Sequence, residues 1–357
     1  MTGHRKPPHA GQASSPFRRR RLSRRPFPLL VLFAAVTLLV ASAFFATACG
    51  QTSDNTTTSL AASTTVAPST ETTAPSTSTT VGGSTFPVTV TDDNGKTVTV
   101  SAKPMRIVST APASTEILFA LGVGDRVVGV TSLCDYPPEA AALPKVGDFQ
   151  ANTEAIMALS PDLVVGYSGN EEALAPVEAA GAAVIILNPA TLDGIYADIT
   201  MVGAATGATA EAAALVEKLK ADVKQVADAA TAKGQAPKVF YALDNTLWTA
   251  GPGSFVDELL QIVHATNVGA MQGEGPAQAY FQFAPEQLVA ADPDVILLPN
   301  TAYKSIDEFV GDSRFAQLKA VKEKRVILID DVIITRPGPR IAEGLKKLLE
   351  AVHPGAL

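Results

Sequence analysis

The chain has 357 residues, enough for more than one domain of ordinary size, and carries 28 Lys and Arg against 35 Asp and Glu. Eight of the basic residues and no acidic residue lie in 1–48, so the remainder, with 20 basic and 35 acidic residues, has a formal net charge of −15. This acidic balance argues against binding to nucleic acid, which needs a basic face against the phosphates.

The first 48 residues have the layout of an export signal. A basic stretch ends at Arg25, an apolar run covers 29–48, and Ala46-Thr47-Ala48 precedes Cys49. This order predicts a signal peptide over 1–48 that ends in a bacterial lipobox, in which Cys49 is acylated and becomes the mature N-terminus. The apolar run is also long enough for an uncleaved anchor. Ser23-Arg24-Arg25-Pro26-Phe27 leaves twin-arginine export open beside the general route.

Residues 49–85 consist mostly of Thr, Ser, Ala, Pro and Gly. Such a composition cannot bury a core, so we expect a disordered tether between the lipidated Cys49 and a folded body. A lipid anchor followed by a spacer predicts an exported protein held at the outer face of the cell membrane.

The folded part begins near Phe86. Two runs that alternate with period two, 86–90 and 97–100, flank Asp93-Asn94-Gly95-Lys96 and predict a β-hairpin. Beyond the hairpin, short β-branched runs alternate with helical stretches rich in Ala and Leu. The strand-like runs include 106–108, 127–130, 163–165 and 184–187. This alternation predicts βα units and a mostly parallel sheet.

An internal repeat divides the folded part into halves. The segment 153–164 recurs without a gap as 285–296, which pairs Glu154 with Glu286. Weaker echoes follow in the same order: 116–118 with 258–260, and 183–187 with 325–329. Each half is therefore predicted to contain, in chain order, a strand, a helix, a strand, a helix and a strand. We predict two similar α/β lobes, over 86–207 and 235–357.

A long helix is predicted between the lobes. Residues 209–233 contain no Gly or Pro, Thr209 suits an N-cap and Gly234 suits the end. About 25 residues at a rise of 1.5 Å make a rod of roughly 37 Å. An apolar stripe recurs at helical spacing: Leu215, Leu219, Val223 and Val226. The predicted fold class is α/β, with two similar lobes that have mostly parallel sheets and are joined by one long rigid α-helix over 208–234.

Four short motifs in this order carry a resemblance to a known family. They are 109–116, Thr131-Ser132-Leu133-Cys134-Asp135-Tyr136-Pro137-Pro138, the Glu repeat, and Arg336-Pro337-Gly338-Pro339-Arg340. The chain resembles, over about 86–354, the substrate-binding proteins of ABC importers for vitamin B12, iron–siderophores and haem. The resemblance implies a monomer without an intrinsic cofactor. It binds a metal chelate between its lobes and delivers it to a permease dimer whose ATPase subunits use the ATP.

The resemblance also implies two docking residues. Glu154 and Glu286 match the positions that, at the tip of each lobe, contact basic residues of the permease. Each follows an N-cap region, Asn152-Thr153 or Ala284-Pro285, so each is expected in the first turn of a helix. A carboxylate in a first turn is also favourable simply because it complements the helix dipole, by about 0.3–1 kcal/mol.

Aromatic residues in loops near strand ends are candidates for the wall of the cleft. We predict as ligand-binding residues Tyr136, Phe149, Tyr167, Trp248, Tyr280 and Arg336. Further candidates are Phe281, Asp135, Asp244, Asp331 and Arg340. The resemblance places Trp248, Tyr136 and Tyr280 at positions that face ligand, while core packing remains open for any single ring.

A corrinoid, above all cobalamin, is the predicted ligand. The segment from Cys134 to Pro138 most resembles the corrinoid binders, and flat apolar rings suit a corrin. Phe149, however, stands where vitamin B12 receptors often carry Trp. An iron–siderophore or haem remains the alternative: the former often calls for several cationic residues, and the latter needs an axial ligand such as Tyr136 or Tyr167. With only His264 and His353 beyond the leader, no bare metal site is predicted.

No enzyme is predicted. The sequence has no Gly-x-Ser-x-Gly elbow and no phosphate-binding Gly/Lys loop. Gly251-Pro252-Gly253-Ser254 is a superficial match, and Ser254 is expected to be an N-cap. Cys134 is expected to be a small buried hydrophobe. An exported surface scaffold without a ligand is the alternative outside transport.

Overall fold

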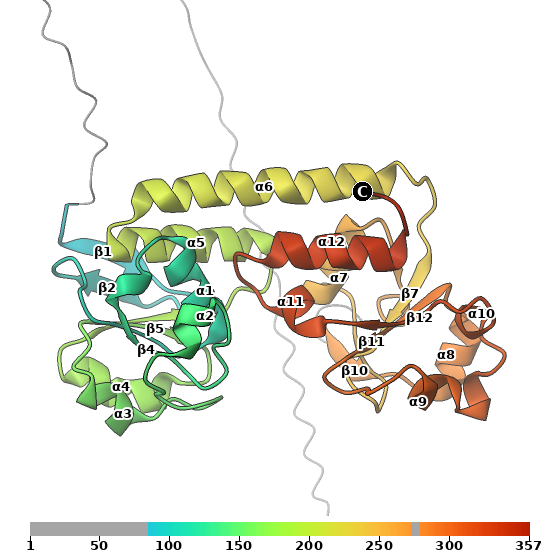
Figure 1. Ribbon diagram of the computed structural model, residues 1–357, viewed down its shortest axis with the longest axis horizontal. Coiled ribbons are helices and arrows are strands. Elements are labelled where there is room, and N and C mark those ends of the chain that lie inside the picture. The colour runs from blue at the N-terminus through green and yellow to red at the C-terminus, as the bar shows by residue number, and fades with distance from the viewer. Residues whose placement is uncertain (1–84, 273–278) are drawn as a thin grey trace, which may run out of the picture. The chain divides into compact units, whose positions relative to one another are not determined.

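The computed structural model describes residues 85–272 and 279–357 (Figure 1). All of these residues fall within one compact unit of the chain. The predicted signal peptide over 1–48, the predicted lipidation site Cys49 and nearly all of the predicted tether lie outside the described residues. Within the two described ranges, no helix combines the length and the apolar character needed to cross a membrane.

The predicted hairpin is present at the start of the first lobe. Strands β1 (Val88–Thr91) and β2 (Thr97–Val100) are antiparallel. In the turn, a side-chain oxygen of Asp92 accepts hydrogen bonds from the backbone N–H groups of Asn94 at 3.1 Å and Lys96 at 2.9 Å. The other oxygen of Asp92 accepts from the N–H of Ile186 at 3.2 Å, which fastens the hairpin to the edge strand of the lobe.

The first lobe is a four-stranded parallel sheet in the order β4-β3-β5-β6. Its strands are β3 (Ile107–Ser109), β4 (Val127–Gly129), β5 (Leu163–Tyr167) and β6 (Ala183–Leu187). Its helices are α1 (Pro112–Ala120), η1 (Gly124–Arg126), α2 (Pro138–Ala141), α3 (Thr153–Ala158), α4 (Glu171–Ala179) and α5 (Leu192–Thr206). The strands are buried almost throughout, as expected for a parallel sheet covered on both faces.

The second lobe repeats this design with the parallel sheet β12-β11-β7-β9 and adds an antiparallel ribbon of β8 and β10. Its strands are β7 (Lys238–Tyr241), β8 (Trp248–Ala250), β9 (Thr266–Asn267), β10 (Tyr280–Gln282), β11 (Val295–Pro299) and β12 (Val326–Ile329). Its helices are α7 (Phe255–Ile262), α8 (Pro285–Ala291), α9 (Asp307–Val310), η3 (Ser313–Phe315), α10 (Lys319–Lys322), α11 (Asp331–Thr335) and α12 (Ile341–Val352).

The internal repeat has a structural counterpart. When the strands are matched in chain order, both sheets have the same spatial order. The aspartate of each Pro-Asp pair also has the same role. Asp162 accepts a hydrogen bond from the N–H of Arg106 at 3.0 Å, and Asp294 accepts one from the N–H of Lys238 at 2.7 Å. Each carboxylate therefore ties the start of the third parallel strand of its lobe, in chain order, to the start of the first parallel strand.

Helix α6 (Thr209–Thr231) joins the lobes, as predicted, and packs against α5 of the first lobe and α12 of the second (Figure 1). Its buried side chains are Ala212, Val216, Leu219, Val226 and Ala230. Leu215 of the predicted stripe is only half-buried at its edge. The predicted N-cap was wrong by one residue, since Ala208 is the N-cap and Thr209 opens the helix. At 1.5 Å per residue the helix is about 35 Å long.

The lobes share part of their core. The largest buried cluster runs from the first sheet through α5, α6 and α7 to the second sheet, whereas two smaller clusters each belong to one lobe. Because close-packed interiors resist deformation, a continuous core together with α6 restricts the relative motion of the lobes.

Candidate functional site

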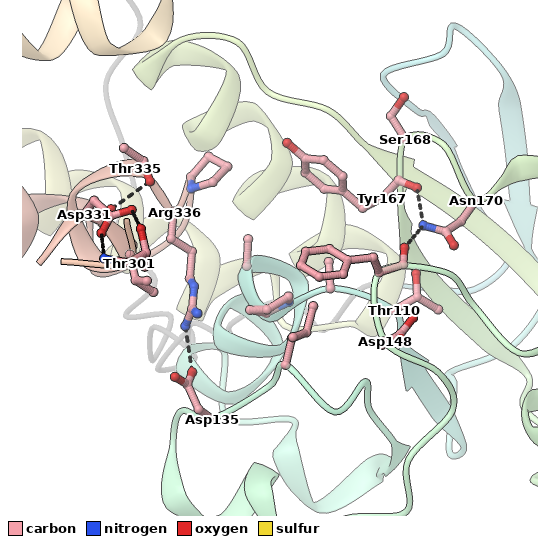
Figure 2. Close-up of a pocket in the computed structure, with 17 residues that line it drawn as sticks. Thr110, Asp135, Asp148, Tyr167, Ser168, Asn170, Thr301, Asp331, Thr335 and Arg336 are labelled. Carbon is pink, nitrogen blue, oxygen red and sulfur yellow. Dashed lines mark hydrogen bonds and ion pairs between the residues drawn. The ribbon is translucent and has the colours of Figure 1, made fainter. Parts of the chain in front are cut away.

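A cavity of about 690 Å³ opens between the two lobes (Figure 2). The first lobe contributes residues that follow β3, two loops around Asp135 and Phe149, and the end of β5. The second lobe contributes Thr301, which follows β11, and residues of α11, which follows β12. The site therefore lies at the carboxyl ends of the strands, where open α/β sheets commonly bind ligands, and its volume is typical of small-molecule sites.

The loop that carries Phe149 is shaped by a glycine. Gly147 has a left-handed φ of 128°, and a Cβ atom on it would lie 2.2 Å from the carbonyl oxygen of Gln150, so only glycine fits. The Gly147 carbonyl accepts a hydrogen bond from the N–H of Ser132 at 2.8 Å. The loop holds the Phe149 side chain at the edge of the cavity with 80% of its surface exposed. A large exposed ring on a cavity wall favours contact with an apolar face of a ligand.

Tyr167 ends β5 and is half-buried in the wall of the cavity (Figure 2). Burial is the main cause that raises the pKa of its phenol, and the neighbouring Asp198 and Tyr280 raise this pKa further. Tyr167 is therefore neutral at physiological pH and presents an O–H group together with a ring face.

The two candidate arginines, Arg336 and Arg340, form ion pairs that link the second lobe to the first. Glu116 of α1 accepts from Nη1 of Arg336 at 2.8 Å, and from Nη2 and Nε of Arg340 at 2.6 and 3.0 Å. Arg336 also donates to Asp135 at 2.9 Å (Figure 2). The guanidinium carbon of Arg340 lies 4.0 Å from the centre of the Tyr136 ring, a cation–π geometry.

These pairings determine the charge states of Arg336 and Asp135. Burial alone lowers the pKa of Arg336, but its contacts with Glu116 and Asp135 outweigh burial and raise that pKa. Burial likewise raises the pKa of Asp135, but the hydrogen bond and charge of Arg336 outweigh it and lower that pKa. Both guanidinium groups are thus fully charged and already matched by carboxylates.

The predicted ligand-binding residues fall into two groups. Phe149, Tyr167 and Arg336 line the cavity. Tyr136, Trp248 and Tyr280 are exposed but do not line it. Tyr136 lies against Arg340, whereas Trp248 and Tyr280 lie on the β8–β10 ribbon.

The further candidates also divide. Asp135 and Asp331 line the cavity. Asp244 instead accepts from the N–H groups of Thr246 and Trp248 and so stabilises its own turn. Lining residues that sequence reasoning did not select include Thr110, Leu133, Asp148, Ser168, Asn170, Thr301 and Thr335. Most of them lie within a few residues of a strand end, which was the available signal.

Of the described residues, His264, His353 and Cys134 do not line the cavity. His353 is buried at the end of α12, with Nε2 3.0 Å from the carbonyl oxygen of Val263. His264 follows α7 with a left-handed φ of 52°. Cys134 is buried as predicted, and Ser254 caps α7 through the N–H of Asp257. Among the described residues, no group of three or more His, Cys, Asp or Glu could hold a metal ion.

Glu154 and Glu286 occupy the first turns of α3 and α8, as predicted, and both side chains are exposed. Asn152 caps α3 by accepting from the N–H of Ala155 at 3.0 Å. At the start of α8, the side chain of Gln287 accepts from the N–H of Ala284 at 3.2 Å. The two glutamates therefore have equivalent positions, each on the helix that precedes the third parallel strand of its lobe in chain order, β5 or β11.

Comparison with known proteins identifies the family of the chain. Residues 107–333 match the model of a family described as periplasmic binding protein. The chain is 35% identical over 279 residues, 75% of its length, to 86% of an uncharacterized ABC transporter substrate-binding lipoprotein, YvrC, of Bacillus subtilis. It is 29% identical, over 75% of its length, to 74% of a cobalamin-binding protein of Halobacterium salinarum.

A solved structure gives the same result for the fold. The periplasmic heme-binding protein RhuT from Roseiflexus sp. RS-1, in its apo form, superimposes with a TM-score of 0.64 at 30% identity. The match covers 71% of this chain and 99% of that protein. The chain therefore belongs to the periplasmic binding protein family and is a substrate-binding protein of the ABC transporter type.

Proposed function

We propose that the cleft binds cobalamin or another corrinoid and that the protein delivers it to a permease. The observation that supports this ligand is the cavity wall, in which the rings of Phe149 and Tyr167 accompany a single arginine, Arg336, whose charge Glu116 and Asp135 already neutralise. A large chelate without a net charge can bury its apolar faces on such rings and hydrogen-bond to the polar groups around them. The relative from Halobacterium salinarum is named a cobalamin-binding protein, which agrees with the proposal.

Haem is the second candidate. Tyr167 lines the cavity and could serve as an axial ligand, and the Roseiflexus relative is named a heme-binding protein. The raised pKa of Tyr167 disfavours the phenolate form that binds iron well, and no histidine lines the cavity within the described residues. An anionic ferric siderophore is less well matched, because Arg336 is already paired.

Calorimetric titration of the whole chain in detergent with cyanocobalamin tests the ligand. We expect one-to-one binding and a higher melting temperature, because a ligand that binds only the native state stabilises it. Phe149→Ala should weaken this binding about tenfold, the effect of losing about 1.4 kcal/mol of ring contact. It should leave the melting temperature of the free protein unchanged, since the ring is 80% exposed.

Met105→Ala is the matched control, because Met105 is also an exposed apolar residue but does not line the cavity. Hemin and a ferric siderophore are titrated alongside. Binding of hemin alone would transfer the proposal to haem, and binding of none of the three would contradict the ligand assignment and favour a surface scaffold.

We further propose that Cys49 carries the lipid anchor and that the body works as a monomer at the outer face of the membrane. The small residues before Cys49 and the name of the Bacillus relative support the anchor. Cys49→Ser is expected to move the protein from the membrane fraction to the soluble exported fraction. A Cys49→Ser protein that still sediments with membranes would instead favour an uncleaved anchor.

A further inference from the structure

Glu116 links the two lobes through ion pairs. It lies on α1 of the first lobe with 2% of its side chain exposed, and it binds both Arg336 and Arg340 of the second lobe. We call Glu116, Asp135, Arg336 and Arg340 the arginine cluster. Two cations face two anions in it, so the cluster as a whole is neutral.

Only part of the arginine cluster faces the cavity. Arg336 and Asp135 line it, whereas Glu116 does not. A buried guanidinium without a carboxylate is costly, and it would attract any anion that reached it. Glu116 therefore sets the charge that the second lobe presents to a ligand without contacting that ligand.

We propose that Glu116 is a specificity-determining residue. By pairing with Arg336 it keeps a free guanidinium group out of the cleft wall and so disfavours anionic chelates relative to uncharged ones. The inference rests on the proposed function, because it concerns which metal chelate the cleft accepts.

The internal repeat supplies a comparison residue. Glu258 of α7 corresponds to Glu116 in the repeat and also links the lobes, because it accepts a hydrogen bond from the N–H of Leu192 at 3.0 Å. No arginine is bonded to Glu258 among the described contacts. The two glutamates thus share a position and a cross-lobe contact, but only Glu116 neutralises cations beside the cavity.

Glu116→Gln is the direct test, because it keeps the shape of the side chain and removes its charge. We expect hemin, with its propionates, and ferric enterobactin, a ferric tris-catecholate, to bind the whole-chain variant about tenfold more tightly than the wild type. Added salt should reduce this gain. Affinity for cyanocobalamin, which has no net charge, should change by less than about threefold.

Asp135→Asn is a second variant that tests the same proposal if Glu116→Gln does not fold. Asp135 is 68% exposed, so its loss frees one bond of Arg336 without burying an unpaired charge. We expect a smaller gain of the same sign. Asp148→Asn is the matched control for net charge, because Asp148 lines the same cavity and caps its own turn at Gln150 instead of binding an arginine. Glu258→Gln is the control for lobe contact.

The outcomes separate this inference from the proposed function. Unchanged binding of both anionic chelates by folded Glu116→Gln and Asp135→Asn would overturn the role of Glu116, whatever the wild type binds. An equal gain in Asp148→Asn or Glu258→Gln would also overturn it, by assigning the effect to net charge or lobe geometry. If the wild type ignores cobalamin while Glu116→Gln gains anionic chelates, the corrinoid proposal fails and the inference stands.

Discussion

Reversing both charges in Glu154→Arg with Glu286→Arg is expected to lower transport by about a hundredfold or more while ligand affinity stays unchanged. The reason is electrostatic, because placing like charges against each other at a protein interface costs several kcal/mol. Both side chains are exposed at equivalent helix starts, so the substitutions leave the core and the cavity intact. Two equivalent carboxylates also suit a partner with two equivalent basic surfaces, such as a permease dimer.

Uptake of labelled ligand by cells or vesicles that contain the permease measures this effect. Each single reversal should give an intermediate loss. Glu172→Arg is the matched control, since Glu172 is an exposed acid in the first turn of α4 and lies outside the repeat pair. Equal losses from Glu172→Arg and from the Glu154 reversal would mean that overall charge, and not docking at these positions, limits transport.

Asp198→Asn is expected to stabilise the protein by about 4 kcal/mol at pH 7. Asp198 lies on α5 with no exposed surface, and neither of its carboxylate oxygens has a hydrogen-bond partner. Burial raises its pKa to about 8, and the nearby carboxylate of Asp93 adds to this shift. Asparagine has the same shape and is neutral without binding a proton, so it removes the cost of protonating this carboxylate when the chain folds at pH 7.

The contribution of Asp198 to the free energy of unfolding is expected to fall as the pH rises. The pKa of Asp198 rises on folding from 3.8 to about 8, so between these values the folded state holds a proton that the unfolded state has lost. Its contribution to the free energy of unfolding is therefore complete below about pH 4 and is lost as the pH rises to about 8, by about 1.4 kcal/mol per pH unit. Asp198→Asn should lack this fall.

Urea unfolding of the wild type and Asp198→Asn at several pH values from 4 to 9 checks both the gain and its slope. Asp193→Asn is the control, because Asp193 is an exposed acid on the same helix. Parallel stability curves for the wild type and Asp198→Asn would contradict a raised pKa at this position.

Local sequence patterns determined much of the fold. The hairpin, the parallel strands, the similarity of the two lobes and the positions of Glu154, Glu286 and Ser254 in first turns or caps followed from periodicity, the internal repeat and capping residues. These features depend on interactions within a few residues or on side chains that alternate between two environments, so a short window of sequence carries them.

Only the tertiary structure decided the composition of the site. It brought Phe149, Tyr167 and Arg336 to one cavity and left Tyr136 and Trp248 outside its lining, although all five are of residue types that suit a ligand. Residue type cannot separate an aromatic side chain on the cavity wall from an exposed one outside it.

The charge of the cleft is likewise a property of the packed lobes. The bond between Glu116 and Arg336 spans 220 positions of the chain. No local sequence pattern indicates that Glu116 and Arg336 are partners. Nor does one indicate that Asp198 is buried without a hydrogen-bond partner. Both facts depend on how the helices of the lobes meet once the sheets and α6 have packed.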